Sequence, residues 1–366
     1  MKVLFLSVTA GQGHNQAGKA AMEPLLDKNV DCVMLDTFEY INPLLKDTIS
    51  QGYLLSTKLT PALYGRIYRL AEKLESNNIK MSISKLTNSV FAKKLAAYIS
   101  DYKPDVIVCT HIFAAQILTQ IRYKGIMVKS IGIVTDYTIH PFWEETDLDY
   151  YIIANELLTR QAVKKGIPEE NIKPLGIPIH KKFSKKISRE EARAILNIEN
   201  KDTILVMSGS MGFGKVTGII RHLDKLDMDF QILSVCGNNA TLRGKIDEMQ
   251  LNKKIYNFGF VYNVDIMMDA ANCIVTKPGG LTISESMAKG LPMAIVNPIP
   301  GQEDRNAEFL LNNGLAVKIT KTFPIDEAVY QLLSNNDKVQ TMISRMNKLA
   351  RPNASEDLAD FILSLS

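Results

Sequence analysis

Short apolar segments alternate with amphipathic helical segments along the whole chain, and this alternation restricts the possible folds more than any other feature. Segments that are apolar throughout are typical of parallel strands with helices on both faces of the sheet. The predicted strands are Val3–Val8, Val30–Leu35, Val106–Cys109, Ile131–Val134, Tyr150–Ala154, Ile204–Met207, Phe230–Val235, Ile255–Phe258, Cys273–Thr276 and Met293–Val296. The sequence therefore predicts an α/β protein built on parallel sheets.

The chain is organised as two halves that begin alike. In each half a strand leads into a glycine turn and then a helix, at Val3–Ala17 and at Ile204–Thr217. Because 366 residues exceed what one core usually supports, we expect two domains, at 1–178 and 179–350, with a final helical segment at 351–366 packing back across them. Ser188 opens the first helix of the second half, with Glu191 completing a capping box. Other predicted helices are Asn15–Asp27, Ala114–Tyr123, Leu281–Lys289 and Glu303–Asn312.

Composition indicates an ordinary globular protein in a reducing compartment. The net charge of +4 is too small to indicate a nucleic-acid partner. Four separated cysteines form no C-x-x-C pair, and we expect Cys109 and Cys273 to be buried thiols. The N-terminal segment lacks the pattern of a signal peptide, and no apolar stretch is long enough to span a bilayer. We therefore expect a cytoplasmic location, with any membrane contact peripheral.

A glycine turn, Gly11-Gln12-Gly13-His14, joins the first strand to the first helix. Glycines there allow backbone N–H groups to approach a ligand, and a helix N-terminus favours anionic or polar groups. The turn is not a dinucleotide fingerprint, because Gln16 occupies the place of the third glycine. A tight turn without a ligand remains an alternative.

A second turn, at Gly209–Lys215, matches the spacing of a P-loop. The residue that should supply a hydroxyl to magnesium is Val216, and the next strand lacks a following aspartate. We therefore exclude a nucleoside triphosphatase. The interpretation that remains is a glycine turn that lies beside a phosphate group of a ligand.

The densest signal is the segment Lys277–Glu285. A Pro-Gly-Gly turn joins a strand to a helix whose first N–H groups, with the Thr282 hydroxyl, suit a diphosphate. Glu285, one turn into the helix, is placed to accept hydrogen bonds from a ribose diol; a carboxylate on a solvated face near the helix N-terminus is the alternative. Downstream, Gln302 and Glu303 lie at the start of another helix, where they can bind sugar hydroxyls.

Taken together and in order, these motifs resemble a known family. KPGGLTISE, PGQEDRNA, VCGNN and AGQGHNQA resemble the monogalactosyldiacylglycerol synthases and bacterial diacylglycerol glucosyltransferases of glycosyltransferase family 28, which are similar to the peptidoglycan N-acetylglucosaminyltransferase that makes lipid II. The resemblance implies a GT-B fold, with two Rossmann-like doubly wound domains facing a cleft. It also implies that a hexose passes from UDP-glucose or UDP-galactose to diacylglycerol.

The resemblance assigns donor-binding roles in the C-terminal half. Uracil is expected at Phe260 and Val261, and the ribose at Glu285. Gln302 and Glu303 are expected to bind the hexose, and Asn238 to assist near the nucleotide. The residues expected around the diphosphate are Gly209, Ser210, Gly280, Leu281 and Thr282.

The N-terminal half is expected to bind the acceptor. His14 is the first candidate for the general base, because an imidazole titrates near neutral pH. Asp136 and His140, in a T-D…H…W pattern that ends at Trp143, are alternatives for the base or for groups that orient it. The acceptor-side set is Gly11, Gly13 and Trp143. His111, His180 and His222 have no comparable context and are interpreted as structural or surface residues.

No metal or other cofactor is expected. Helix N-termini can offset the diphosphate charge of the leaving group. The strings Asp147-Leu148-Asp149 and Asp227-Met228-Asp229 match a metal-binding D-x-D pattern that the family does not use, and both are interpreted as surface charge. A single displacement with one base would invert the anomeric carbon and give a β-glycoside.

A basic stretch indicates how such a chain reaches a lipid. Between Lys58 and Lys94 the sequence holds eight basic residues and two acidic ones, interleaved with apolar side chains. A segment of this kind can lie among anionic headgroups at the inner face of the cell membrane, although a solvated helical face is the alternative.

Two further functions remain open at this stage. The same fold can act on a polyprenyl-linked or other amphiphilic acceptor. A UDP-sugar epimerase or hydrolase would need no lipid.

Overall fold

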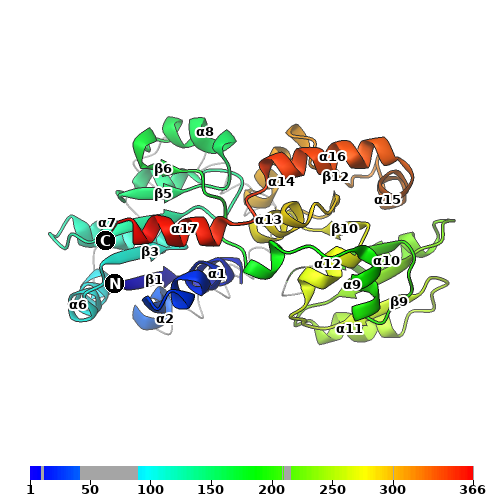
Figure 1. Ribbon diagram of the computed structural model, residues 1–366, viewed down its shortest axis with the longest axis horizontal. Helices are drawn as coiled ribbons and strands as arrows, with labels where there is room; N and C mark the ends of the chain where they lie inside the picture. Colours follow the sequence, from blue (N-terminus) through cyan, green and yellow to red (C-terminus); the bar gives the residue numbers. More distant parts are fainter. Residues whose placement is uncertain (10–11, 42–89, 208, 210–215, 300, 366) are drawn as a thin grey trace. The chain divides into compact units, whose positions relative to one another are not determined.

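The computed structural model describes residues 1–9, 12–41, 90–207, 209, 216–299 and 301–365 (Figure 1). Its contacts divide the chain into two compact units. Unit 1 comprises 1–181, 299–302 and 353–366, and unit 2 comprises 182–298 and 303–352, each apart from the residues outside the described ranges. The change from one unit to the other falls between Lys181 and Lys182, three residues after the boundary expected from the sequence.

Unit 1 contains a parallel sheet whose described strands have the order β2-β1-β3-β4-β5-β6. Their bounds are β1 Lys2–Ser7, β2 Asp31–Asp36, β3 Val106–Cys109, β4 Lys129–Ile133, β5 Tyr150–Ile152 and β6 Ile172–Lys173. Residues such as Val3, Phe5 and Val108 are fully buried in its core, as expected for strands covered on both faces.

Helices cover this sheet, and one of them comes from the end of the chain. In the described part of unit 1 they are α1 Gly13–Asp27, α2 Thr37–Ile41, α6 Val90–Tyr102, α7 Ile112–Arg122, α8 Thr159–Lys164 and α17 Ala354–Leu363. Short 3₁₀ turns are η1 Pro141–Glu145, η2 Glu156–Leu158, η3 Glu169–Asn171 and η4 Lys181–Phe183, the last at the junction of the units. The red helix α17 lies against α1 and adds Leu358 and Ile362 to the core of unit 1 (Figure 1).

Unit 2 contains a second parallel sheet, with the described strands in the order β12-β11-β10-β7-β8-β9. The strands are β7 Thr203–Met207, β8 Gln231–Val235, β9 Ile255–Phe258, β10 Cys273–Thr276, β11 Met293–Ile295 and β12 Ala316–Lys318. The helices are α9 Arg189–Ile195, α10 Val216–Asp224, α11 Ala240–Asp247, α12 Val264–Ala270, α13 Gly280–Lys289, α14 Gln302–Asn312, α15 Ile325–Ser334 and α16 Asn336–Leu349. The predicted capping box is confirmed at its first bond, because Glu191 N donates to Ser188 Oγ at 3.1 Å.

The apolar segments of the sequence correspond to the central strands, and both predicted sheets are present. The sequence missed β6 and β12, which are two and three residues long and close one edge of each sheet. Segments so short carry no recognisable apolar run. Cys109 and Cys273 are buried as expected, and burial raises the pKa of the Cys273 thiol to about 12.

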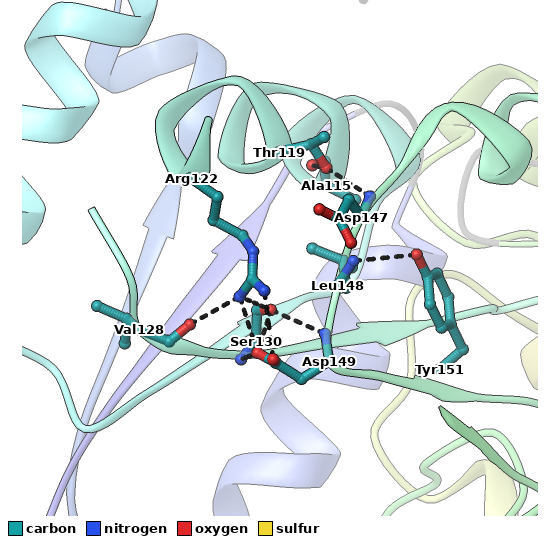
Figure 2. Close-up of polar contacts among 9 residues, drawn as sticks. All are labelled: Ala115, Thr119, Arg122, Val128, Ser130, Asp147, Leu148, Asp149 and Tyr151. Carbon is teal, nitrogen blue, oxygen red and sulfur yellow. Dashed lines mark hydrogen bonds and ion pairs between the residues drawn. The ribbon is translucent and has the colours of Figure 1, made fainter. Parts of the chain in front are cut away.

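A partly buried ion pair fixes the entry to β5, as Figure 2 shows. Arg122 Nη1, at the end of α7, lies 2.8 Å from Asp149 Oδ2, and Ser130 N donates to the same oxygen at 2.8 Å. Burial would raise the pKa of Asp149, but the hydrogen bonds from Arg122 and Ser130 outweigh it and hold that pKa below its ordinary value. The interpretation of Asp149 as surface charge is therefore wrong, because a buried arginine on another element of the fold pairs with it; Asp147 is exposed.

The same contacts hold the long loop between β4 and β5. Asp147 N donates to Thr119 Oγ1 at 3.0 Å, and Leu148 N donates to the Tyr151 hydroxyl at 3.1 Å (Figure 2). This loop carries Asp136 and His140, so the network fixes the end of the segment in which two candidate site residues lie.

Candidate active site

Each sheet has a point where successive connections leave in opposite directions. In unit 1 it lies between β1 and β3, which are paired in parallel with Leu6 beside Cys109. In unit 2 it lies between β7 and β10, with Met207 beside Thr276. In open α/β sheets, ligands bind outside the carboxyl ends of the strands at such points. Of the turn glycines found in the sequence, Gly13, Gly209 and Gly279 are among the described residues and follow β1, β7 and β10, so the topology brings them to these two places.

His14 lies in the first turn of α1, at the carboxyl end of β1. Its Nδ1 atom is 2.9 Å from the Thr110 carbonyl oxygen and 3.0 Å from Thr135 Oγ1. A carbonyl oxygen only accepts, so Nδ1 carries the proton and donates it to Thr110. The lone pair of the neutral ring is therefore on Nε2, the atom that a general base uses.

The electrostatics of His14 favour this neutral form. Burial lowers the pKa of His14 from its ordinary value, while the Asp136 carboxylate and the hydrogen bond to the Thr110 carbonyl partly oppose that effect. At neutral pH the ring is thus able to take up a proton. The Asp136 carboxylate acts on His14 in the direction that would stabilise an imidazolium.

The chain on both sides of the first glycine turn is anchored to β2. Thr9 N donates to Asp36 Oδ2 at 2.8 Å, and Asn15 Nδ2 donates to Thr9 Oγ1 at 3.0 Å. Ser7 Oγ in turn donates to Asn15 Oδ1. Gly13 begins α1, whereas Gly11 lies outside the described residues. The position of His14 is therefore set by contacts that precede and follow the turn.

His111 lies beside His14, which the sequence did not indicate. The two ring centroids are 4.4 Å apart at an interplanar angle of 74°. His111 is buried at the start of α7 and caps that helix, because Phe113 N donates to its Nδ1 at 3.1 Å. The structural interpretation of His111 was incomplete, since β1 and β3 are neighbours only after the sheet forms. By contrast, His180 binds Glu23 and His222 is exposed on α10.

The residues of the T-D…H…W segment lie in different environments. His140 Nδ1 accepts from Phe142 N at 3.1 Å and caps η1. Trp143 is buried against the sheet, and a Cβ atom on Gly132 would lie 2.7 Å from its ring. The expected contact of Trp143 with an acceptor therefore gains no support, because its ring fills the core beneath the loop.

In unit 2, the Pro-Gly-Gly turn leads from β10 into α13. Gly279 is the N-cap and has no side chain to cap the helix, so the first N–H groups of α13, from Gly280 to Thr282, have no partner from a capping side chain. Such groups suit an anion. Asn306, fully buried on α14, donates from Nδ2 to the Pro278 carbonyl oxygen at 3.0 Å and so fixes the turn. The sequence showed Asn306 only as part of a motif.

Glu285 lies one turn into α13 and is half-buried. Burial raises the pKa of its carboxyl to about 8, with Lys182 lowering it and Asp265 raising it. Lys182 Nζ is 3.4 Å from Asp265 Oδ1, so this cation is shared between the two carboxyl groups. This environment differs from that of the fully solvated carboxylate that the alternative describes.

The remaining donor-side candidates follow the carboxyl ends of neighbouring strands of the same sheet. Gly209, after β7, has a φ of 73°, a conformation that favours glycine. Asn238 is exposed after β8, and Phe260 is 47% exposed after β9 beside the half-buried Val261. Ser210 lies outside the described residues.

Gln302 and Glu303 begin α14 as expected, but the contacts assign them to different units. Gln302 belongs with unit 1, where its Nε2 donates to Asp136 Oδ2. In this structure the amide expected to bind a hexose is engaged by a carboxylate. Among the described residues, no three His, Cys, Asp or Glu side chains converge in a metal-binding arrangement.

Comparisons with known proteins agree with these features. The family described as monogalactosyldiacylglycerol (MGDG) synthase matches residues 14–179, and the glycosyltransferase family 28 C-terminal domain matches residues 203–358. The chain is 30% identical over 373 residues to a processive diacylglycerol beta-glucosyltransferase of Bacillus cereus, covering 99% of this chain and 93% of that protein.

Solved structures show the same fold. MurG of Acinetobacter baumannii matches with a TM-score of 0.64 at 16% identity, covering 99% of both chains. The UDP-GlcNAc 2-epimerase of Neisseria meningitidis, bound to UDP-GlcNAc, matches with a TM-score of 0.61 at 14% identity over all of both chains. The fold is therefore GT-B, as the resemblance implied, and it is shared by enzymes of more than one reaction class.

Proposed function

Because this chain belongs to the glycosyltransferase family of the MGDG synthases and processive diacylglycerol glucosyltransferases, we propose that it transfers a hexose from a UDP-sugar to diacylglycerol. The observation that carries the chemistry is the His14 ring, whose Nδ1 is committed to the Thr110 carbonyl and whose Nε2 therefore bears the basic lone pair. An alcohol acceptor needs such a base at neutral pH.

The proposed reaction is a single displacement. His14 Nε2 takes the proton of the acceptor hydroxyl as its oxygen attacks the anomeric carbon, and the bond from that carbon to the diphosphate breaks. The transition state has oxocarbenium character. The first N–H groups of α13 and the turn at Gly209 stabilise the departing UDP, and Glu285 holds the ribose. One displacement inverts the anomeric carbon, so an α-linked donor gives a β-glycoside.

We propose that the reaction needs no divalent metal, since backbone N–H groups at a helix N-terminus can offset the diphosphate charge. Transfer measured after exhaustive chelation should equal transfer with added Mg²⁺ or Mn²⁺. A loss of activity on chelation, restored by one of these ions, would show that the helix N-terminus is insufficient.

Because diacylglycerol is a membrane lipid, the proposed reaction takes place at a membrane surface. We propose peripheral attachment to the inner face of the cell membrane through the basic stretch from Lys58 to Lys94, most of which lies outside the described residues. No described helix is long and apolar enough to cross a bilayer. Binding to vesicles should then require anionic lipid and weaken in high salt.

The test is transfer of radiolabelled sugar into a chloroform-extractable product. UDP-glucose and UDP-galactose are compared on diacylglycerol vesicles that contain anionic lipid, and the anomeric configuration of the product is read by NMR. Label in a β-glycosyl diacylglycerol supports the proposal and identifies the donor. Conversion of the UDP-sugar without lipid would instead indicate an epimerase or hydrolase, and label on a polyprenyl acceptor alone would replace diacylglycerol.

Two histidine substitutions, one at His14 and one at a control position, test whether His14 is the base. Replacing His14 with alanine should lower kcat by about 10²–10⁴-fold, the usual contribution of a general base, with little change in UDP affinity. His222→Ala is the matched control, because His222 is exposed on α10 in unit 2. Near-normal turnover of the His14 variant would eliminate this residue as the base.

A further inference from the structure

His111 lies in the site without a role in the reaction outlined above. It immediately follows Thr110, whose carbonyl oxygen accepts the proton of His14 Nδ1, so one stretch of chain contacts His14 twice. Its ring meets the ring of His14 edge to face, with the centroids 4.4 Å apart. On another side it lies 5.1 Å, between centroids, from Phe113. His111 is 7% exposed, so a buried ring lies against one side of the His14 ring.

The protonation state of His111 is restricted by its role as a helix cap. Its Nδ1 accepts the Phe113 N–H at 3.1 Å, so in the neutral ring the proton is on Nε2. Protonating Nδ1 would break that hydrogen bond and place a cation beside His14. Burial, together with His14 on α1 and His140 at η1, lowers the pKa of His111 well below its ordinary value. The carboxylate that faces this group of rings is Asp136, which acts on His14.

We propose that His111 is a positioning residue for His14: its buried ring, held by the cap of α7, fixes the plane of the His14 imidazole and keeps it desolvated, so that Nε2 stays oriented and unprotonated. This inference rests on the proposed function for its effect on turnover, but its effect on the His14 ring is independent of the reaction.

Two substitutions of His111 separate its role as a helix cap from the contact of its ring with His14. His111→Asn retains an acceptor for Phe113 N, because asparagine is among the best N-cap residues, but it removes the ring. His111→Phe retains an aromatic ring against His14 but removes the acceptor. A purely structural role predicts that the asparagine variant behaves as wild type. A positioning role predicts that it does not, even though its Tm is preserved.

The first measurement is NMR of protein labelled at histidine. The chain has five histidines, and His14→Ala assigns the signal of interest. In wild type, His14 should carry its proton on Nδ1 and titrate below the ordinary histidine range. In His111→Asn, water replaces the ring, so the pKa of His14 should rise and its signals should broaden. In His111→Phe, the titration of His14 should remain close to that of wild type.

Turnover provides the second measurement. For His111→Asn we expect kcat to fall by about ten- to a hundredfold at unchanged KM for the donor, with the acid limb of the kcat–pH profile moved to higher pH. For His111→Phe we expect most of kcat to be kept despite a lower Tm.

An asparagine variant with wild-type His14 titration and wild-type kcat would overturn the proposal and leave His111 as a helix cap. That result is decisive even when the phenylalanine variant does not fold. Failure of the proposed function has a different signature, because the wild-type protein would then form no glycosyl diacylglycerol, or His14→Ala would keep its turnover, while the NMR effect of His111→Asn on His14 persists.

Discussion

The raised pKa of Glu285 predicts that donor binding depends strongly on pH. The two hydroxyls of a ribose donate hydrogen bonds, and a carboxylate accepts both, whereas a protonated carboxyl group offers only one full acceptor. The pKa of Glu285 is about 8, chiefly because the side chain is buried. At pH 7 only about one-tenth of the carboxyl groups would be ionised, so the donor must bind with loss of a proton.

The size of the change in affinity follows from the fraction of protein in which Glu285 is ionised and therefore competent to bind. Affinity for the UDP-sugar should be about tenfold weaker at pH 7 than on the plateau above pH 9, which corresponds to about 1.4 kcal/mol. Below the pKa, affinity should fall about tenfold for each pH unit. At pH 7, binding should release close to one proton per site.

Titration calorimetry in buffers of different ionisation enthalpy measures both the affinity and the released proton. A UDP-sugar is preferred to UDP, because its diphosphate is esterified at both ends and does not titrate in this range. Glu285→Gln should bind weakly and without pH dependence. Because Lys182 lowers the pKa of Glu285 and Asp265 raises it, Lys182→Met should move the midpoint upward and Asp265→Asn should move it downward. Wild-type affinity that is constant between pH 6 and pH 9 would refute the reasoning.

Three further predictions concern residues that hold the loops of the candidate site in each unit. Gly132→Ala should destabilise the fold by about 1–3 kcal/mol, because its Cβ would lie 2.7 Å from the Trp143 ring; Gly244→Ala, with open space around its Cβ, is the matched control in a Tm measurement. Asp149→Asn should lower stability by about 1–3 kcal/mol at pH 7, because a neutral amide replaces the carboxylate that bonds to Arg122. Since the pKa of Asp149 is depressed in the fold, this contribution is present above its unfolded pKa and lost as pH falls through the folded value, so the two proteins should converge in acid unfolding curves. Asn306→Ala should weaken UDP-sugar binding by about 1–3 kcal/mol, measured by calorimetry, because the Pro278 turn loses its buried donor; an unchanged affinity would remove that turn from the donor site.

The sequence was informative where local pattern and burial coincide. The central strands were predicted because a parallel strand covered on both faces must be apolar throughout, which leaves a visible run. The places of Gly13, Gly209 and Gly279 after β1, β7 and β10 were predicted because each glycine lies between a strand and a helix in the sequence itself. The edge strands β6 and β12 were missed, since two or three residues are too few to show any period.

The contacts that the sequence did not indicate join residues that are distant in the sequence. Asp149 was interpreted as surface charge because its partner, Arg122, belongs to another element. The small residue Gly132 on β4 makes room for the ring of Trp143 in the core, and the contact of Trp143 with an acceptor stays a prediction. His111 gains its place beside His14 only when β1 and β3 pair. Each of these contacts is created by sheet order, which no local pattern encodes.

A sequence motif alone cannot identify the base, because a backbone group decides which nitrogen of the His14 ring carries the proton. The atom that selects the tautomer of His14 is the carbonyl oxygen of Thr110, and any residue at that position supplies a carbonyl. Thr110→Val should therefore leave the Nδ1–H tautomer and kcat close to those of wild type. Thr135→Val removes the second partner of Nδ1, a hydroxyl 3.0 Å away, and should leave the tautomer intact while loosening the ring. Histidine NMR on the two variants separates these effects. If Thr135→Val moved the proton from Nδ1 to Nε2, the hydroxyl would be the group that sets the tautomer, and the basic lone pair of His14 would depend on a side chain rather than on the backbone at the end of β3.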